Sequence, residues 1–316
     1  MAEQAITLSD YSVSEDEVSV EFTYKKDTVI STYRIFPGVL LGFNRIKTPE
    51  LPPVFPNAAL FTGRVVYRIN FSLEGICEIY THAGNYIYVK GGCVTLSRER
   101  AAKPFFYPTC FYTGIEIYIL EEALDANPEP LTLFGIDLKR INDRYLTDQR
   151  TLISNSSKQL SDAITALRAA HAASTDLARL RFHSLTVLHL LSSDDIQLVP
   201  MHLSALTAQQ VNATRSAEKA LTQDLSKRLS IAEVAREIGV GETSLKNWFR
   251  AVFGKNISVY LRDHRITEAK RLLDDTAMPI SAIGNTVGFE NQSKFTQMFK
   301  KHCGLTPSDY RKRNML

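Results

Sequence analysis

The chain has 316 residues, of which 44% are hydrophobic, so it is long enough for two domains and apolar enough to give them sizeable cores. It contains no run of 18 apolar residues, and its first residues lack the basic start and apolar stretch of a signal peptide. We therefore expect neither a membrane-spanning helix nor a leader. The four cysteines are scattered without a CxxC pair, which argues against a zinc site or a disulfide framework, fits a reducing cytoplasm and predicts small buried thiols.

The net charge of +3 is unevenly distributed along the chain. Residues 213–316 hold 18 Lys and Arg against 11 Asp and Glu, a net of +7. The first 212 residues hold 19 against 23, a net of −4. A basic C-terminal segment on an acidic remainder indicates a polyanionic partner for that segment.

Residues 1–150 have the pattern of a β domain. Short stretches rich in β-branched and aromatic residues are separated by turn signals at Pro37-Gly38, Ala83-Gly84-Asn85 and Gly91-Gly92, which predicts a β-barrel or sandwich. The stretches are 18–26, 29–36, 64–73, 77–84, 86–97 and 114–122. The segment 48–58 holds four prolines and cannot be a regular element. Aromatic residues between 57 and 120 could line a ligand cavity or form plain core.

Residues 151–205 form the next predicted segment, which is helical. Apolar residues recur at helical spacing through Leu160, Ile164 and Leu167, and again from Leu177 to Leu191. Two such helices could pair with a second copy of the chain or pack back on their own barrel, and the sequence leaves both arrangements open.

Residues 206–316 are predicted to be wholly helical and contain an internal duplication. The expected helices are 208–226, 230–238, 241–253, 256–275, 279–287, 290–302 and 306–312. Residues 230–239 align with 279–288 at an offset of 49, and the offset becomes 50 beyond the turn, as far as Tyr260 and Tyr310. The two copies keep their register over about thirty positions with a single one-residue shift, and chance similarity would not do so.

Each repeat has the features of a helix-turn-helix unit. A small residue lies where the second helix crosses the first (Ala235, Gly284), and a glycine that accepts a positive φ forms the turn (Gly239, Gly288). The second helix needs an apolar side, which we expect to bury Leu245, Trp248, Phe249 and Phe253 in one unit and Phe295, Met298 and Phe299 in the other. Its opposite side is polar and free to enter a major groove about 12 Å wide.

Nineteen residues, 257–275, separate the two units and have apolar positions at helical spacing. At about 1.5 Å per residue they predict a rod of roughly 28 Å. One turn of DNA is about 34 Å, so a single chain could present two reading helices to successive major-groove segments.

The segment 280–312, ISAIGNTVGFENQSKFTQMFKKHCGLTPSDYRK, resembles the signature of the AraC/XylS family of bacterial transcription regulators. It contains the pieces IxxIxxxVGFxxxSxFxxxFKKxxGxTPxxYR, and the resemblance extends over about residues 206–316. Gly284 departs from the alanine usual in that family and should weaken its helix slightly.

The resemblance assigns two kinds of DNA contact. It implies base reading by Thr243, Ser244 and Asn247 in the first unit and by Gln292, Ser293 and Gln297 in the second. Lys246, Arg250, Lys294 and Lys300 would then contact phosphates. No arginine occupies a base-reading position, so bidentate readout of guanine is not expected.

The resemblance also implies an α+β architecture with a cupin-like, effector-binding barrel at 1–150, a segment used for dimerisation at 151–205 and a DNA-binding domain at 206–316. The implied protein is a cytoplasmic, sequence-specific transcription regulator, an activator that responds to a small-molecule effector of unknown identity. Its partners would be double-stranded DNA, RNA polymerase and a second copy, with no membrane, metal or cofactor.

Two alternatives remain. A cupin-type metalloenzyme fused to a DNA-binding domain would need several histidines and a carboxylate inside the barrel, where the sequence offers only His82. No P-loop, GxSxG, GxGxxG or HExxH motif occurs either, so we expect no enzyme. A DNA-binding protein without a ligand is the other alternative.

Overall fold

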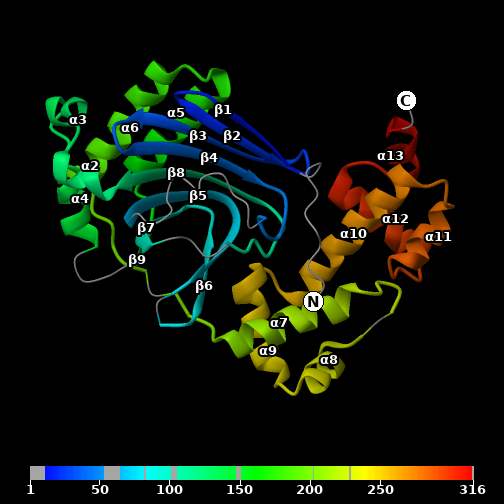
Figure 1. The fold of residues 1–316 in the computed structure, drawn as a ribbon. Coiled ribbons are helices and arrows are strands. Elements are labelled where there is room, and N and C mark those ends of the chain that lie inside the picture. The colour runs from blue at the N-terminus through cyan, green and yellow to red at the C-terminus, as the bar shows by residue number, and fades with distance from the viewer. Residues whose placement is uncertain are drawn as a thin grey trace. The chain divides into compact units, whose positions relative to one another are not determined.

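The computed structural model divides the chain into two units, Met1–Ala205 and Leu206–Leu316 (Figure 1). The structure describes residues 11–52, 65–81, 83–100, 105–146, 151–201, 203–227 and 229–314. His82 and much of the proline-rich segment lie outside the described residues. Among the helices of the described residues, none combines the length and the apolarity needed to cross a bilayer.

The first unit is built on one antiparallel sheet of nine strands. Its order is β1-β2-β3-β4-β8-β5-β7-β9, and β6 pairs with the far end of β5. The strands are β1 (Tyr11–Glu15), β2 (Ser19–Tyr24), β3 (Thr28–Phe36), β4 (Val39–Ile46), β5 (Val65–Tyr80), β6 (Tyr86–Lys90), β7 (Cys93–Arg100), β8 (Tyr112–Leu120) and β9 (Thr151–Asn155). Turns lie at Pro37-Gly38 and Gly91-Gly92 as predicted, and β5 joins the two predicted stretches 64–73 and 77–84 into one strand.

Three of the described strands, β1, β4 and β9, lie outside the predicted stretches. β4 is buried at seven of its eight positions, so its sequence VLLGFNRI lacks the alternation that marks a half-buried strand. The segment predicted to be helical from residue 151 begins instead with β9, which pairs with β7 from Cys93↔Asn155 to Ser97↔Thr151. A five-residue strand whose partner lies more than fifty residues away carries little local signal.

The two faces of the sheet differ in chemistry. Odd-numbered residues of the first half of β5 (Tyr67, Ile69, Phe71) pack into a large apolar core with the helices of this unit. Because side chains alternate along a strand, Arg68 and Asn70 face the other way, where they are buried with Glu116 of β8. Of the aromatic residues in question, Tyr67 and Phe71 are therefore plain core.

The described helices beside the sheet are α2 (Glu121–Ala126), α3 (Glu129–Leu133), α4 (Leu138–Tyr145), α5 (Lys158–Ala173) and α6 (Leu177–Ser192). The apolar residues of α5 and α6 lie in the same core as the sheet; they include Leu160, Ile164, Leu167, Leu180 and Leu191. Their regular apolar spacing is thus explained by packing on their own sheet.

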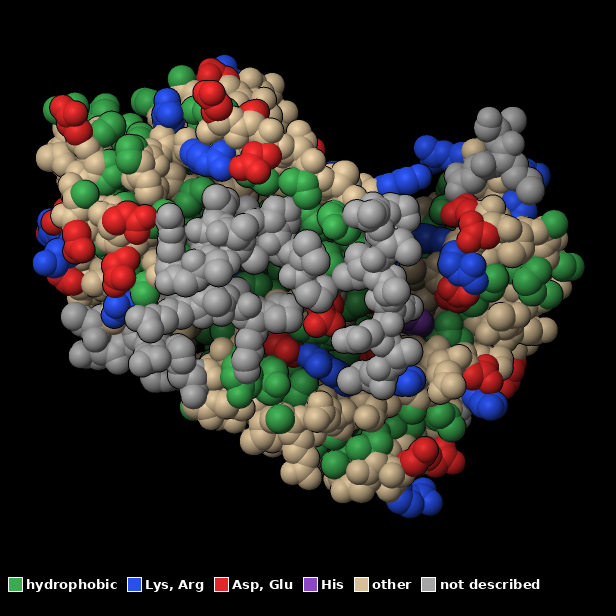
Figure 2. Space-filling view, in the orientation of Figure 1, with side chains coloured by type: hydrophobic (Ala, Val, Ile, Leu, Met, Phe, Trp, Pro, Cys, Tyr) green, Lys and Arg blue, Asp and Glu red, His purple; other side chains and the backbone are tan. Residues whose placement is uncertain are grey.

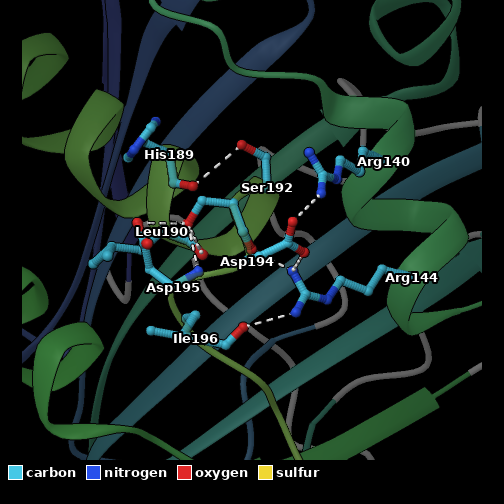
Figure 3. A network of polar contacts seen from close by, with 9 residues as sticks. Arg140, Arg144, His189, Leu190, Ser192, Asp194, Asp195 and Ile196 are labelled. Atoms are coloured by element: carbon cyan, nitrogen blue, oxygen red, sulfur yellow. Dashed lines mark hydrogen bonds and ion pairs between the residues drawn. The ribbon is translucent and has the colours of Figure 1, made fainter.

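Two arginines of α4 hold the segment that follows α6 (Figure 3). Arg140 pairs with Asp194 at 2.7 Å, and Arg144 pairs with the same carboxylate at 3.4 Å. Arg144 also donates to the carbonyl oxygens of Ser193 and, at 2.9 Å, of Ile196. These bonds satisfy carbonyls beyond the helix end and fix where the chain leaves α6.

The regular elements described in the second unit, residues 206–316, are all helices. They are α7 (Ala208–Thr222), α8 (Ile231–Ile238), α9 (Glu242–Phe253), α10 (Ile257–Asp275), α11 (Ile280–Thr286), α12 (Gln292–Cys303) and α13 (Pro307–Asn314). The predicted α+β class, with a β domain followed by helices, is confirmed. One expectation about the thiols is wrong: Cys77 and Cys93 are buried, but Cys110 is exposed at a turn where its φ is +51°.

Candidate nucleic-acid interface

The first helix-turn-helix unit consists of α8 and α9. A capping box starts α8: the Ser230 hydroxyl accepts from the Glu233 amide at 3.1 Å, and the Glu233 carboxylate accepts from the Ser230 amide at 2.8 Å. The amide of Ser230 holds the pKa of Glu233 below its usual value. α8 ends at Gly239, whose φ of +76° allows the turn into α9.

The second helix-turn-helix unit repeats this arrangement with α11 and α12. Gly288, with a φ of +80°, forms the corresponding turn. The Asn291 side chain caps α12 by accepting from the Lys294 amide at 2.9 Å. Phe295 and Phe299 on the inner side of α12 are fully buried, as are Leu245 and Phe249 on α9. Each second helix is therefore fixed by its apolar side.

Nine of the ten residues assigned to DNA contact are exposed. On α9 these are Thr243, Lys246, Asn247 and Arg250, whereas Ser244 is half-buried. On α12 they are Gln292, Ser293, Lys294, Gln297 and Lys300. At the repeat offset of 50, Thr243 corresponds to Ser293, Asn247 to Gln297 and Arg250 to Lys300. These positions are spaced i, i+4, i+7, so each helix carries one polar stripe opposite its buried side.

Two of these side chains have neighbours within their own unit. Lys246 pairs with Glu242 one turn earlier at 2.5 Å. The Oε1 atom of Gln292 lies over α11, where it would be 3.1 Å from a Cβ on Gly284. The glycine at 284 therefore gives Gln292 room that an alanine would reduce.

The prediction that Trp248 belongs to the buried side of α9 is only partly right. Leu245, Phe249 and Phe253 are buried, but Trp248 is half-exposed, and so is its counterpart Met298. Both residues lie at the margin of the apolar side, where the exposed stripe begins. A single sequence cannot distinguish the centre of an apolar stripe from its edge.

The connector between the two helix-turn-helix units is α10, a helix of 19 residues that matches the predicted connector 257–275 and begins one residue after the expected helix 256–275. Its first half contacts the first helix-turn-helix unit, where Tyr260 packs against Phe249 and Phe253 at ring-centroid distances of 5.2 and 4.8 Å. Its second half shares a core with the second unit through Ile266, Ala269, Leu272 and Leu273. Figure 2 shows Lys and Arg side chains around α13, whose last turn holds Arg311, Lys312 and Arg313.

Comparison with known proteins identifies this pair of units. A family model described as a helix-turn-helix domain matches residues 234–313. The chain is 31% identical over 132 residues to the arabinose operon regulatory protein of Escherichia coli K12, covering 42% of this chain and 45% of that protein. It is 32% identical over 181 residues to the virulence regulon transcriptional activator VirF of Yersinia enterocolitica, covering 56% and 65%. Over residues 234–313 this chain therefore carries a helix-turn-helix domain, and over part of its length it is similar to these two regulators.

The chain spans less than two thirds of the length of these two relatives. A solved AraC-type regulator from Chromobacterium violaceum is 25% identical, with a TM-score of 0.32, over 34% of this chain and 96% of that one. Within the described residues, no three His, Cys, Asp or Glu side chains gather as a metal site.

Proposed function

We propose that this chain is a sequence-specific DNA-binding transcription regulator, an activator that responds to a small molecule bound by its N-terminal unit. The observation that carries the proposal is the pair of polar stripes on α9 and α12, each exposed on a helix whose other side is buried. The names of the relatives, an operon regulator and a transcriptional activator, support the same function.

In this proposal the two second helices enter successive major-groove segments. Asn247 and Gln297 carry amides that can bond adenine in two places, and Thr243, Ser244, Gln292 and Ser293 supply further short contacts to base edges. Lys246, Arg250, Lys294 and Lys300 bind phosphates, which position the helices without reading sequence. Lys246 would exchange its pairing with Glu242 for a phosphate.

The effector site is proposed on the face of the sheet that carries Arg68 and Asn70. The Arg68 guanidinium lies 3.6 Å from the Glu116 carboxylate, and both side chains are more than nine-tenths buried. Tyr112 donates to Asn70 at 2.7 Å beside them. Burying such a pair costs desolvation, which an apolar core would avoid. The polar groups therefore favour a polar small molecule as the effector.

The remaining partners follow from the same function. As an activator the protein would contact RNA polymerase, and it would act in the cytoplasm without catalytic activity. A homodimer is proposed through the outer side of α6, where Phe182 is 65% exposed although the apolar side of that helix is already packed on the sheet. Sedimentation of the wild type and of Phe182→Ser tests this, and a dimer unaffected by the substitution would place the interface elsewhere.

Selection of duplexes from a random library by the full-length protein tests the proposed function. We expect enrichment of a site with two short motifs about one helical turn apart, bound with an affinity that falls steeply with salt. Recovery of no enriched sequence would contradict sequence-specific binding. A thermal-shift screen of polar metabolites tests the effector site, with Arg68→Met as the variant that should lose any shift.

A further inference from the structure

The connector α10 changes character at its centre. Tyr260 anchors its first half, since its hydroxyl donates to Glu218 of α7 at 3.0 Å. The second half is held by the apolar core of the second unit, beginning at Ile266. Between them, the five residues 261–265 are all half-buried, and none is among the buried core residues. This central segment is where one unit could turn relative to the other.

Arg265 joins the two units on one side of this segment. Its Nη2 lies 3.4 Å from the carbonyl oxygen of Leu225, in the segment that runs from α7 to the first helix-turn-helix unit. Its Nη1 lies 3.5 Å from the carbonyl oxygen of Gly288, the turn glycine of the second unit. The two main chains also meet directly, because a Cβ on Gly288 would lie 2.1 Å from the Leu225 oxygen.

Asp263 makes a second connection. Its Oδ2 accepts from Lys255 Nζ at 2.6 Å, just after α9, and its Oδ1 lies 3.7 Å from His302 Nε2 near the end of α12. Two residues along a helix are about 200° apart, so Asp263 and Arg265 lie on nearly opposite sides of α10. Connections on both sides resist rotation and bending of one unit relative to the other.

We propose that Arg265 is a positioning residue that sets the angle between the two helix-turn-helix units, so that both bind DNA only at one fixed separation of their motifs. A planar guanidinium can direct two N–H donors to two carbonyl oxygens at once, which a lysine ammonium does less well. The inference rests on the proposed function, because it assumes that α9 and α12 both enter the groove.

The test compares the selected duplex with the same duplex carrying two extra base pairs between its motifs. The insertion rotates one motif by roughly 70° relative to the other. For the wild-type full-length protein we expect an affinity loss on the order of a hundredfold, because two linked sites lose their mutual advantage when geometry forbids joint binding. Arg265→Met should bind the uninterrupted duplex more weakly and lose only severalfold on insertion.

Arg271→Met is the matched control. Arg271 lies on the same helix and pairs at 2.6 Å with Glu268 and at 3.3 Å with Asp275, both of α10. It should keep the full insertion loss, and Arg265→Lys should fall between the wild type and Arg265→Met. An insertion loss as large for Arg265→Met as for the wild type would overturn the inference.

A second measurement needs no DNA and separates failure of this inference from failure of the proposed function. Spin labels are attached through Glu237→Cys on α8 and Asn285→Cys on α11, both exposed positions, after Cys110 and Cys303 are replaced by serine. The distance distribution between the labels should be narrow in the wild-type background and broad with Arg265→Met. Equally narrow distributions would overturn the inference even if DNA binding is absent. If Arg265→Met does not fold, Arg265→Gln replaces it in both measurements.

Discussion

The carbonyl oxygen of Leu225 lies against the main chain of Gly288, and a Cβ on residue 288 would approach it to 2.1 Å. The corresponding glycine of the first helix-turn-helix unit, Gly239, has nearly the same φ, but a Cβ placed on it would meet no neighbour within 4 Å. The two turns are therefore equivalent in backbone conformation and different in surroundings.

Alanine at these two turns should separate backbone strain from contact between the units. Gly239→Ala should cost about 1–2 kcal/mol, the penalty of a left-handed conformation for a residue with a side chain. Gly288→Ala should cost a further 1–3 kcal/mol or so, because the Leu225 carbonyl must move. Urea unfolding followed by the fluorescence of Trp248, the sole tryptophan, reports on this unit. Equal costs would mean that the loop yields freely.

Trp248 and Phe249 should differ in their contribution to stability. Phe249 is fully buried, so Phe249→Ala should cost about 3–5 kcal/mol. Trp248 is half-exposed, and Trp248→Ala should cost only about 1–2 kcal/mol. Far-UV circular dichroism measures both, since the fluorescent probe is lost in one of them. A larger cost for Trp248 would restore the buried position expected from the sequence.

Arg250→Ala and Lys300→Ala should weaken binding to all duplexes alike. Each removes one proposed phosphate contact and should reduce the slope of log affinity against log salt by about 0.9. Fluorescence anisotropy at several salt concentrations measures this. Glu237→Gln, an exposed change on α8, serves as the control that should leave the slope as it is. An unchanged slope in the two cation variants would remove them from the interface.

Asn247→Ala and Gln297→Ala should instead alter sequence preference. Loss of a bidentate contact should reduce discrimination by about 1–3 kcal/mol at one base pair and leave the other positions unaffected. Binding to a panel of single-base variants of the selected site locates the affected pair. The two substitutions should act on different motifs, and an identical effect of both would contradict one reading helix per motif.

His171 should make the stability of the N-terminal unit, Met1–Ala205, sensitive to acid. Its ring stacks on Phe43 at a centroid distance of 3.7 Å and shares a hydrogen bond with Tyr33 at 3.1 Å, and burial lowers its pKa below the usual 6.5. Below pH 6.5 the unfolded chain takes up a proton that the folded unit resists. Stability should therefore fall as the pH drops from 6.5 through the lowered pKa of the folded state.

Calorimetry between pH 8 and pH 5 follows this loss. Trp248 lies in Leu206–Leu316, so the unfolding transition of Met1–Ala205 is the one that tryptophan fluorescence does not report. His171→Gln should flatten its pH dependence, whereas His189→Gln, at an exposed position of α6, should not. A pH dependence unaltered by His171→Gln would assign the acid sensitivity to other groups.

Much of the helical unit, residues 206–316, could be predicted because its elements are determined by residues close together in the sequence. Ser230 and Glu233 form a capping box within four residues, Gly239 and Gly288 each allow a turn that residues with side chains resist, and the 19-residue spacing sets the length of α10. The repeat adds a register that places Asn247 and Gln297 at corresponding points of two helices.

Only the tertiary structure shows the strand pairings and side-chain contacts between residues that are distant in the sequence. β9 forms because the edge of β7 offers it hydrogen bonds, and Arg68 meets Glu116 because two strands pair in one register. Leu225 reaches Gly288 through the path of the chain around α10. Patterns of spacing record which side of an element is buried, but not which surface covers it, since that is fixed only when separate elements pack together.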